Sequence, residues 1–265
     1  MSNQPPHPSG QSDPFTVPPA APVQPQSSGN VVLWVVLGVI GVMMLMCGGV
    51  VVALLLPAIN AGRHAAQRMS RSNNAKQVAL GIHNYHAAYK QLPFTVNANS
   101  DGEETIGWRI ALSPFVEGQA QWEAIDSNES WASSTNMAVF QNPPLSFQSP
   151  SGEIGETGIF AIVSDESMFP PTPYTIVRFR DVTDGLANTV MMVELPNRTT
   201  VWSSTENMTP DEAFAAIASM EDAQSAHLIM ADGAVRAVTN SLERELFDAL
   251  VTRAGGDDVL AGLEL

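Results

Sequence analysis

The chain has 265 residues, of which 27 are acidic and 12 are basic, giving a net charge of −15, and it contains one cysteine. All but one of the acidic residues follow residue 76, so this part should present an acidic surface that repels nucleic acid and anionic lipid. We therefore expect no nucleic-acid partner. The lone cysteine, Cys47, excludes a disulfide within the chain.

The first 30 residues are rich in proline, serine and glutamine and contain no lysine or arginine. A segment of this composition cannot bury enough apolar surface to offset the entropy lost on ordering. We therefore expect residues 1–30 to be a disordered, proline-rich tail. The tail lacks the basic start of a secretory signal peptide, and the apolar run that follows is too long and too late for one.

Residues 31–56 form an uncharged run dominated by valine, leucine and isoleucine. As a helix rising about 1.5 Å per residue, this run reaches roughly 39 Å, which exceeds the hydrocarbon core of about 30 Å. We therefore expect a transmembrane helix over residues 31–57, with membrane lipid as the partner of residues 31–56.

The helix is expected to continue beyond the membrane over residues 58–92. Pro57 removes one backbone donor and should kink the helix without ending it. Farther on, apolar residues at three- and four-residue spacing predict one buried face, which we expect to pack on a sheet of the same chain. The expected buried stripe comprises Ala75, Val78, Ile82, Tyr85, Tyr89 and Leu92, and the side chains expected to stay polar around it are those of Arg63, Arg68, Arg71, Lys76 and Lys90.

Residues 93–265 predict an acidic head of mixed α and β structure. Prolines make residues 93–172 rich in loops. A two-residue turn at Asp232-Gly233 indicates a type I′ hairpin. One helix is expected to start at Thr209. A second helix is expected to open with Asn240 and Glu243 and to stop at Gly255-Gly256. Strands are expected at residues 174–180, 190–195, 227–231 and 234–238.

Two stretches, ALLLPA at residues 53–58 and RSNNAKQVALGIHNYH at residues 71–86, resemble the DUF1559 family of bacterial pilin-like proteins. The resemblance implies an α+β, pilin-like fold, in which a long N-terminal helix lies half in the membrane and packs by its second half on an antiparallel sheet. The family has no established enzymatic activity or ligand. The further matching positions are residues 107–109, 112–117, Trp131, Asn136, 184–185, 188–189, Glu194, 230–236 and 250–256.

Several family features are missing here. No basic leader, Gly-Phe cleavage site or glutamate accompanies the span, so the sequence gives no support for prepilin processing or for polymerisation through that glutamate. Asp222 stands where the family's H-x9-DG motif has its histidine, and His227 is not its equivalent. Ser72 and Ser149 stand where the family often has cysteines, which fits the loss of a disulfide.

Two groups of residues are candidates for binding a metal. His83 and His86 have the spacing of a metal pair on a helix, but no third ligand can be named. Asp181, Asp184 and Asn188 offer oxygen ligands of the kind that Ca²⁺ prefers, and Ca²⁺ is the one cofactor considered. The alternatives are that Tyr85 and one histidine pack on or hydrogen-bond to the sheet and that the loop side chains bond to their own backbone.

No enzyme class is supported by the sequence. No serine lies in a G-x-S-x-G motif, and paired carboxylates are typical of solvated loops. Four tryptophans, at positions 108, 122, 131 and 202, could stack on sugars, but core packing is the favoured interpretation. Structural roles are expected for Pro57, Asn73, Asn74, His83, Tyr85, His86, Trp108, Asp184, Gly185, Asp232 and Gly233.

Two signals for the orientation of the chain conflict. Four basic residues follow the span and none precedes it, which places the head in the cytoplasm, whereas the pilin resemblance places it outside. Following the family, we expect a non-enzymatic, single-pass protein of the bacterial cytoplasmic membrane, with an extracytoplasmic head and a structural or assembly role. Other pilin-like subunits are candidate partners. The alternative is a membrane-tethered module that binds Ca²⁺ or carbohydrate.

Overall fold

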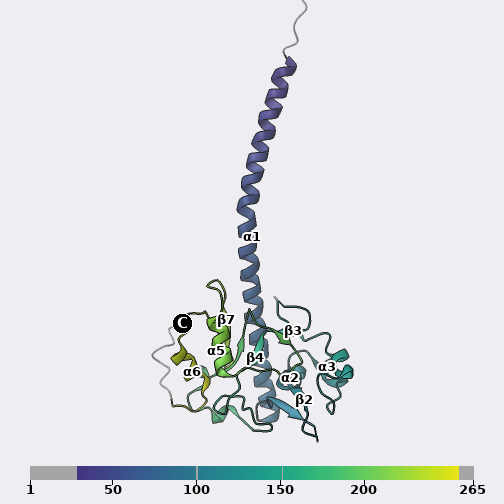
Figure 1. Ribbon diagram of the computed structural model, residues 1–265, viewed down its shortest axis with the longest axis vertical. Helices are drawn as coiled ribbons and strands as arrows, with labels where there is room; N and C mark the ends of the chain where they lie inside the picture. Colours follow the sequence, from purple (N-terminus) through teal and green to yellow (C-terminus); the bar gives the residue numbers. More distant parts are fainter. Residues whose placement is uncertain (1–28, 100, 151, 257–265) are drawn as a thin grey trace, which may run out of the picture. The chain divides into compact units, whose positions relative to one another are not determined.

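The computed structural model describes residues 29–99, 101–150 and 152–256 (Figure 1). The chain divides into two compact units, Met1–Ala58 and Ile59–Leu265. The α+β class expected from the sequence is confirmed, because a long apolar N-terminal helix is followed by antiparallel sheets.

The helix α1 spans Gly29–Tyr89 and contains Pro57 within it. In the first unit its valine, leucine, isoleucine and methionine side chains are exposed. Within the part of the chain that the structure describes, α1 is the one helix that is long and apolar enough to cross a membrane.

The elements after α1 are short, as the prolines of residues 93–172 predict for that stretch. The helices are α2 (Trp108–Leu112), α3 (Gln119–Ala124), α4 (Ser134–Val139), α5 (Pro210–Ala218) and α6 (Arg244–Val251), with 3-10 turns η1 (Ser113–Phe115), η2 (Leu145–Phe147), η3 (Phe179–Asp181) and η4 (Leu186–Asn188). The strands are β1 (Val96–Ala98), β2 (Glu104–Gly107), β3 (Glu156–Thr157), β4 (Ile159–Ala161), β5 (Val190–Glu194), β6 (Thr200–Val201), β7 (Ala226–Met230) and β8 (Val235–Val238).

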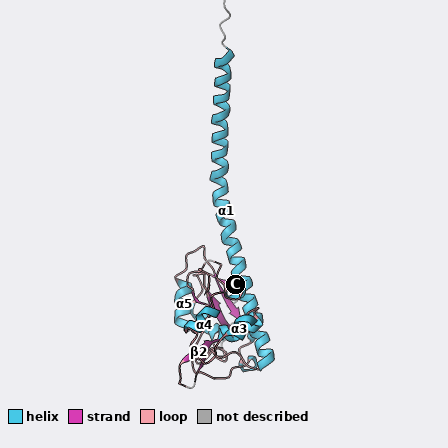
Figure 2. Ribbon diagram, turned by 90° about the vertical axis from the view of Figure 1, so that its right-hand side faces the viewer, coloured by secondary structure: helices cyan, strands magenta, loops and turns pink. Residues whose placement is uncertain are grey.

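The second unit is built around a four-stranded antiparallel sheet with the strand order β4-β5-β7-β8. Strands are drawn in magenta in Figure 2. In this sheet Glu194 of β5 lies opposite His227 of β7, and Ile229 of β7 lies opposite Val235 of β8. Two further antiparallel pairs, β1-β2 and β3-β6, form sheets of their own.

The turn between β7 and β8 differs from the expected type I′ turn at Asp232-Gly233. The Gly233 N–H donates to the Met230 carbonyl, and Gly233 is the one residue of this loop with a positive φ, +90°. A type I′ turn needs positive φ at both central residues, so this is a type I turn followed by a left-handed glycine. Asp232 Oδ1 accepts a hydrogen bond from the Ala234 N–H, which explains the aspartate.

Both faces of the four-stranded sheet are buried. One face packs against the part of α1 that follows Ala58 (the α1 face), and the other packs against α5 and α6 (the α5–α6 face). A bulge shifts the register of β5 between Val190 and Met192. As a result Met191 and Met192 both lie on the α1 face, while Val190 and Val193 lie on the α5–α6 face.

The apolar stripe predicted on the second half of α1 is confirmed in its centre. Ala75, Val78 and Ile82 are completely buried in the core of the α1 face. Two predictions at its margins are wrong. Tyr89 is 57% exposed because it is the last residue of the helix, and Arg71, expected to stay polar at the surface, is only 5% exposed.

The helices of the α5–α6 face start where the sequence predicts. α5 begins with a capping box, in which Thr209 Oγ1 accepts from the Glu212 N–H and the Glu212 carboxylate accepts from the Thr209 N–H. α6 begins after Glu243 and buries Phe247 and Leu250 against the sheet. The start of α5 therefore follows from a local capping signal, whereas Glu243 makes no side-chain cap and α6 follows from its periodic apolar face.

Residues 174–180 do not form the strand that their alternation predicts. They run as irregular chain into η3, and Tyr174 has a φ of +61°. The alternation is present, since Val177 is buried and Ile176 is 47% exposed. The backbone of Val177 instead accepts a hydrogen bond from the Leu92 N–H, and no strand of the described residues pairs with this segment.

Candidate functional site

Three charged or titratable side chains meet between α1 and the sheet (the Arg71–Glu194–His227 cluster). Glu194 Oε2 lies 2.7 Å from His227 Nδ1, and Glu194 Oε1 lies 3.5 Å from Arg71 Nη1. The exposed fractions of Arg71, Glu194 and His227 are 5%, 3% and 4%. A single buried carboxylate therefore links one helix to two neighbouring strands.

Periodicity brings these three residues together. Arg71 lies one turn before the buried stripe of α1 and so continues its buried face. Glu194 is two residues from Met192, and His227 is two residues from Ile229, both of which face α1. Because side chains alternate along a strand, Glu194 and His227 must face α1 as well.

A buried carboxylate is costly unless it is paired and hydrogen-bonded, and here it has a partner on each oxygen. Removing one member of a buried charged pair costs about 3–5 kcal/mol, whereas replacing the whole set with apolar residues is often neutral. The cluster therefore adds little net stability, but it favours one alignment of α1. A shift of α1 by one turn, about 5.4 Å, would separate Arg71 from Glu194.

Arg71 also lines a surface groove of about 470 Å³. One wall of the groove is a single face of α1, and the remaining walls come from the chain after β5 and the loop before β7. Arg71 Nη1 is buried and makes no hydrogen bond, since its contact with Glu194 lacks hydrogen-bond geometry. The polar side chains that line the groove are those of His64, Gln67, Arg68, Arg71, Glu221 and Gln224.

The two histidines considered as a metal pair pack on one aromatic ring. His83 and His86 each lie with their ring centroid 4.6 Å from that of Phe179. A Cβ added to Gly233 of the hairpin turn would lie 3.3 Å from His83 Nε2. Burial, followed by neighbouring positive groups, lowers the pKa of His86, and Asp181 opposes this shift. Both histidines therefore pack on Phe179 of η3, and His83 also lies near Gly233 in the turn between β7 and β8.

Asp184, a candidate calcium ligand, binds the chain that follows α6. Its Oδ2 accepts hydrogen bonds from the Gly255 N–H at 2.7 Å and from Thr252 Oγ1 at 3.3 Å. Its Oδ1 accepts from the Gly256 N–H at 3.0 Å. Both carboxylate oxygens of Asp184 therefore already accept hydrogen bonds from this protein.

The other two candidate calcium ligands also make local hydrogen bonds. Asp181 Oδ2 accepts from the Arg178 N–H at 2.8 Å, and Asn188 Nδ2 donates to the Asp184 carbonyl at 3.1 Å. Gly185 between them has a φ of +95°, which suits a glycine in this turn. Across residues 29–99, 101–150 and 152–256, no group of three or more His, Cys, Asp or Glu side chains is arranged to hold a metal ion.

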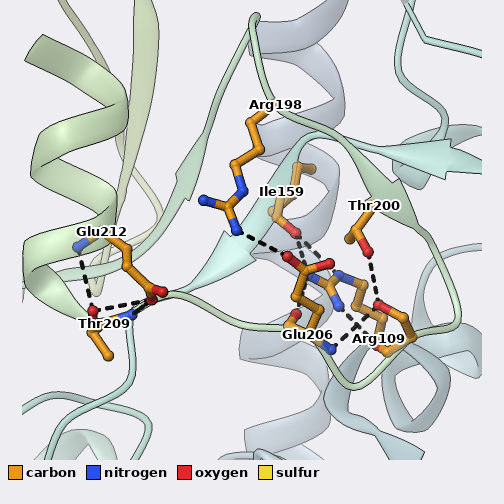
Figure 3. A network of polar contacts seen from close by, with 8 residues as sticks. Arg109, Ile159, Arg198, Thr200, Glu206, Thr209 and Glu212 are labelled. Atoms are coloured by element: carbon orange, nitrogen blue, oxygen red, sulfur yellow. Dashed lines mark hydrogen bonds and ion pairs between the residues drawn. The ribbon is translucent and has the colours of Figure 1, made fainter. Parts of the chain in front are cut away.

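Arg109 of α2 is completely buried and is surrounded by backbone carbonyls (Figure 3). Its Nε and Nη2 donate to the Ile159 carbonyl at 3.0 and 2.8 Å, Nη1 donates to the Ser204 carbonyl at 2.9 Å, and Nη2 donates to the Glu206 carbonyl at 3.0 Å. Its guanidinium also lies 4.9 Å from the ring centroid of Trp108. Arg109 therefore joins α2, β4 and the loop after β6.

The electrostatics of this network follow from its burial. Burial lowers the pKa of Arg109 to about 9, and the charge of Glu206 partly offsets this. Burial also acts to raise the pKa of Glu206, but hydrogen bonds from Thr200 and Arg198 outweigh it, so the net shift is downward. The Arg198–Glu206 contact is 3.0 Å long. The network is a structural link, because the donors of Arg109 are occupied by the protein's own carbonyls.

The tryptophans divide by burial. Trp108 and Trp202 are completely buried, and their indole N–H groups donate to Asn207 and to a backbone carbonyl. These two are core residues and cannot stack on a sugar. Trp122 is 37% exposed and Trp131 is half-buried.

The remaining predicted structural residues lie along α1. Asn74 Nδ2 donates to the Gln148 carbonyl at 2.9 Å, whereas the neighbouring Asn73 is exposed. Tyr85 is half-buried and packs edge-on against Phe115. Asn74 and Tyr85 thus connect α1 to the loop-rich part of the head.

Sequence reasoning missed the Arg71–Glu194–His227 cluster, although each member carried a signal. The basic side chain of Arg71 favours the polar side of the helix, but its four-residue spacing from Ala75 puts it on the stripe. Glu194 is a lone charge at the end of a compact apolar run, and His227 precedes another such run. A charged residue in phase with buried neighbours is itself expected to be buried.

A protein-family model described as a protein of unknown function, DUF1559, matches residues 60–176. The match covers the second half of α1 and the elements through β4, including the segments around residues 71–86 and 107–117 that carry the resemblance in the sequence. Comparison with curated proteins and with solved structures gives no match.

Proposed function

We propose, from the premise that residues 60–176 belong to the DUF1559 family, that this is a membrane-anchored, non-enzymatic protein of the bacterial cell envelope. In this proposal the protein has a pilin-like build, its head lies outside the cytoplasm, and it acts in a structural or assembly role with other pilin-like subunits. The observation that carries the proposal is α1, since one helix holds both an apolar segment of membrane-spanning length and the side chains that form the core of the α1 face.

A structural role is supported by how the polar residues of the head are used. Glu194 contacts Arg71 and His227, and Asp184 accepts from the backbone after α6. Arg109 donates to three backbone carbonyls. Glu194, Asp184 and Arg109 therefore bind to other parts of the chain and hold its elements together, which supports a structural role.

The first test is topology, because the basic residues after the span and the family resemblance point in opposite directions. The full chain with a C-terminal tag is expressed, and intact spheroplasts are treated with protease. We expect the tag to be digested while a cytoplasmic control protein stays intact. A tag that survives until the membrane is lysed would place the head in the cytoplasm and overturn the envelope proposal.

The assembly role needs a separate test. Formaldehyde cross-linking of cells that express the tagged full chain should give discrete species larger than the monomer, at a yield that is stable across expression levels. The control is a soluble protein carrying the same tag, which should remain monomeric. If the topology is confirmed but the protein stays monomeric at every expression level, the assembly role is contradicted. Membrane anchoring alone would then remain of the proposal.

A further inference from the structure

We propose that the groove lined by Arg68 and Arg71 binds a phosphate-type oxyanion, supplied by the headgroup of an anionic phospholipid. The groove has a volume of about 470 Å³, within the range of about 300–1,000 Å³ typical of small-molecule sites. The acidic surface that should repel anionic lipid is formed by residues after residue 76. Arg68 and Arg71 come before residue 76 and do not belong to that surface.

The helical wall of the groove presents a row of nitrogen-bearing side chains. His64, Gln67, Arg68 and Arg71 follow the spacing of three, one and three residues, which places them on one face of α1. Each of them can donate hydrogen bonds, and the two arginines can do so in the forked geometry that matches phosphate oxygens. This face therefore suits an acceptor-rich anion.

Arg71 provides the second, independent observation. The side chain of Arg71 is only 6% exposed. Its Nη1 nevertheless makes no hydrogen bond and lies 3.5 Å from Glu194 Oε1. Buried donors in proteins almost always have a partner, so Arg71 keeps a donor that its contact with Glu194 does not satisfy. Nη1 is itself closed to solvent, so a phosphate oxygen in the groove would accept a charge-assisted hydrogen bond from it after a shift of the Arg71 side chain.

Glu221 opposes the proposal and gives it a sharp test. It is the one acidic side chain among the described residues that line the groove, and it is exposed on the wall facing α1. Its charge should weaken the binding of an anion, and removing that charge should strengthen it. A groove that bound a cation would respond in the opposite way.

The phospholipid is favoured as the source because the groove wall begins directly after the apolar segment in the sequence. Ala61 lines the groove and follows the predicted span of residues 31–57 by only four positions. The inference takes membrane anchoring from the proposed function but not the envelope location or the assembly role. Failure of the topology or cross-linking tests would therefore leave it standing.

The experiment uses the purified full chain in a zwitterionic detergent. Inorganic phosphate, short-chain phosphatidylglycerol and short-chain phosphatidylcholine are titrated separately at constant ionic strength, and thermal unfolding is followed by tryptophan fluorescence. We expect phosphatidylglycerol to raise the unfolding temperature at the lowest concentration, phosphate to do so at a higher one, and phosphatidylcholine to have little effect.

Variants assign the effect to the groove. Arg68→Gln should weaken the apparent affinity roughly tenfold or more, the size of one hydrogen bond to a charged group. Arg63→Gln is the matched control, since Arg63 is exposed on the same helix but does not line the groove, and it should change the affinity less than about twofold. Glu221→Gln should tighten binding. Arg71 is left unchanged because it belongs to the buried cluster.

Each outcome decides the matter. Stabilisation by phosphatidylglycerol that falls in Arg68→Gln and rises in Glu221→Gln supports the proposal. Stabilisation by phosphate but not by the lipid keeps the oxyanion site and overturns the membrane source. No stabilisation by either ligand, or an equal loss in Arg63→Gln, shows that the groove is not an anion site.

Discussion

On the α5–α6 face of the four-stranded sheet, the buried strand positions hold apolar side chains such as Leu228 and Phe160, and the guanidiniums of Arg109 and Arg198 lie over the ring of Phe160. On the α1 face, equally buried strand positions hold Glu194 and His227, which meet Arg71 from the helix. The strands are the same, so the difference comes from what covers each face. Apolar contacts are non-directional, whereas a charged cluster is satisfied in a single arrangement.

This contrast teaches that the two faces do different work. The α5–α6 face contributes most of its stability through buried area, and its residues can be exchanged for others of similar volume. The α1 face adds a condition on alignment, because α1 must place Arg71 opposite Glu194. Apolar contacts alone would not fix the position of α1 along the sheet. The requirement that Arg71 lie opposite Glu194 selects one position.

The largest expected effect comes from breaking the charged cluster. Glu194→Leu leaves the guanidinium of Arg71 buried beside an apolar side chain, and we expect it to lower the free energy of unfolding by about 3–5 kcal/mol. Denaturant unfolding of the full chain in detergent, followed by the fluorescence of Trp108 and Trp202, measures the change. A loss below about 1 kcal/mol would show that the cluster does not bear on stability.

Two controls sharpen this first prediction. The triple variant Arg71→Met, Glu194→Leu, His227→Leu removes the whole cluster and should recover most of the lost stability. Leu250→Met on the α5–α6 face should cost less than about 1.5 kcal/mol, because the change conserves the volume of an apolar side chain. If the triple variant is as unstable as the single one, burial of charge is not the cause.

A smaller effect is expected at the margin of the α5–α6 face, where Asp184 holds the chain after α6. Asp184→Ala removes the acceptor of the Gly255 and Gly256 N–H groups and should cost about 1–3 kcal/mol. Calcium should not change the unfolding temperature of the unaltered protein, because both oxygens of Asp184 already accept hydrogen bonds. A rise with calcium that disappears in Asp184→Ala would establish a calcium site instead.

The hairpin turn on the α1 face offers a matched pair of glycines. Gly233 and Gly155 have similar positive φ values, +90° and +93°, but only Gly233 has a neighbour within 4 Å of an added Cβ, namely His83. Gly155→Ala should cost about 1–2 kcal/mol from backbone strain alone. Gly233→Ala should cost more, and the difference in unfolding free energy measures the contact with His83. Equal losses would show that the histidine simply moves aside.

The smallest expected effect is the pH dependence that His86 contributes. Its pKa is lower in the folded protein than its ordinary value, so the unfolded chain takes up a proton first as the pH falls. The stability that neutral His86 contributes is therefore fully present above its ordinary pKa. It is lost as the pH falls from the ordinary pKa through the lower pKa that His86 has in the folded protein. His86→Gln should lose less stability than the unaltered protein between about pH 7 and pH 5. Identical pH profiles of the unaltered protein and His86→Gln would contradict the prediction.

Much of the fold could be predicted because it rests on local signals. The stripe at Ala75, Val78 and Ile82, the capping box at Thr209 and the paired strands β7 and β8 all follow from spacing over a few residues. The irregular course of residues 174–180 could not be predicted in this way. Its alternation matches a strand, and only the absence of a neighbouring strand among the described residues decides against one.

The candidate site was harder to predict because its members are far apart in the sequence. Arg71, Glu194 and His227 come from a helix and two strands, and each is ordinary when read by itself. Their meeting depends on the register of β5 with β7 and on which turn of α1 covers it. A lone charge in phase with buried positions was the available signal, and it identifies a residue without identifying its partner.

The bulge in β5 has a consequence for how this sequence can change in length. Because Met191 and Met192 lie on the same face, deleting Met191 leaves Val190, Met192, Val193 and Glu194 on the faces that they already occupy. Deleting Val193 would reverse every position that follows and turn the carboxylate of Glu194 into the apolar side of the sheet. β5, in which every residue is buried, thus tolerates the loss of one of its two methionines with both faces preserved, whereas the loss of the next residue, Val193, exchanges the two faces.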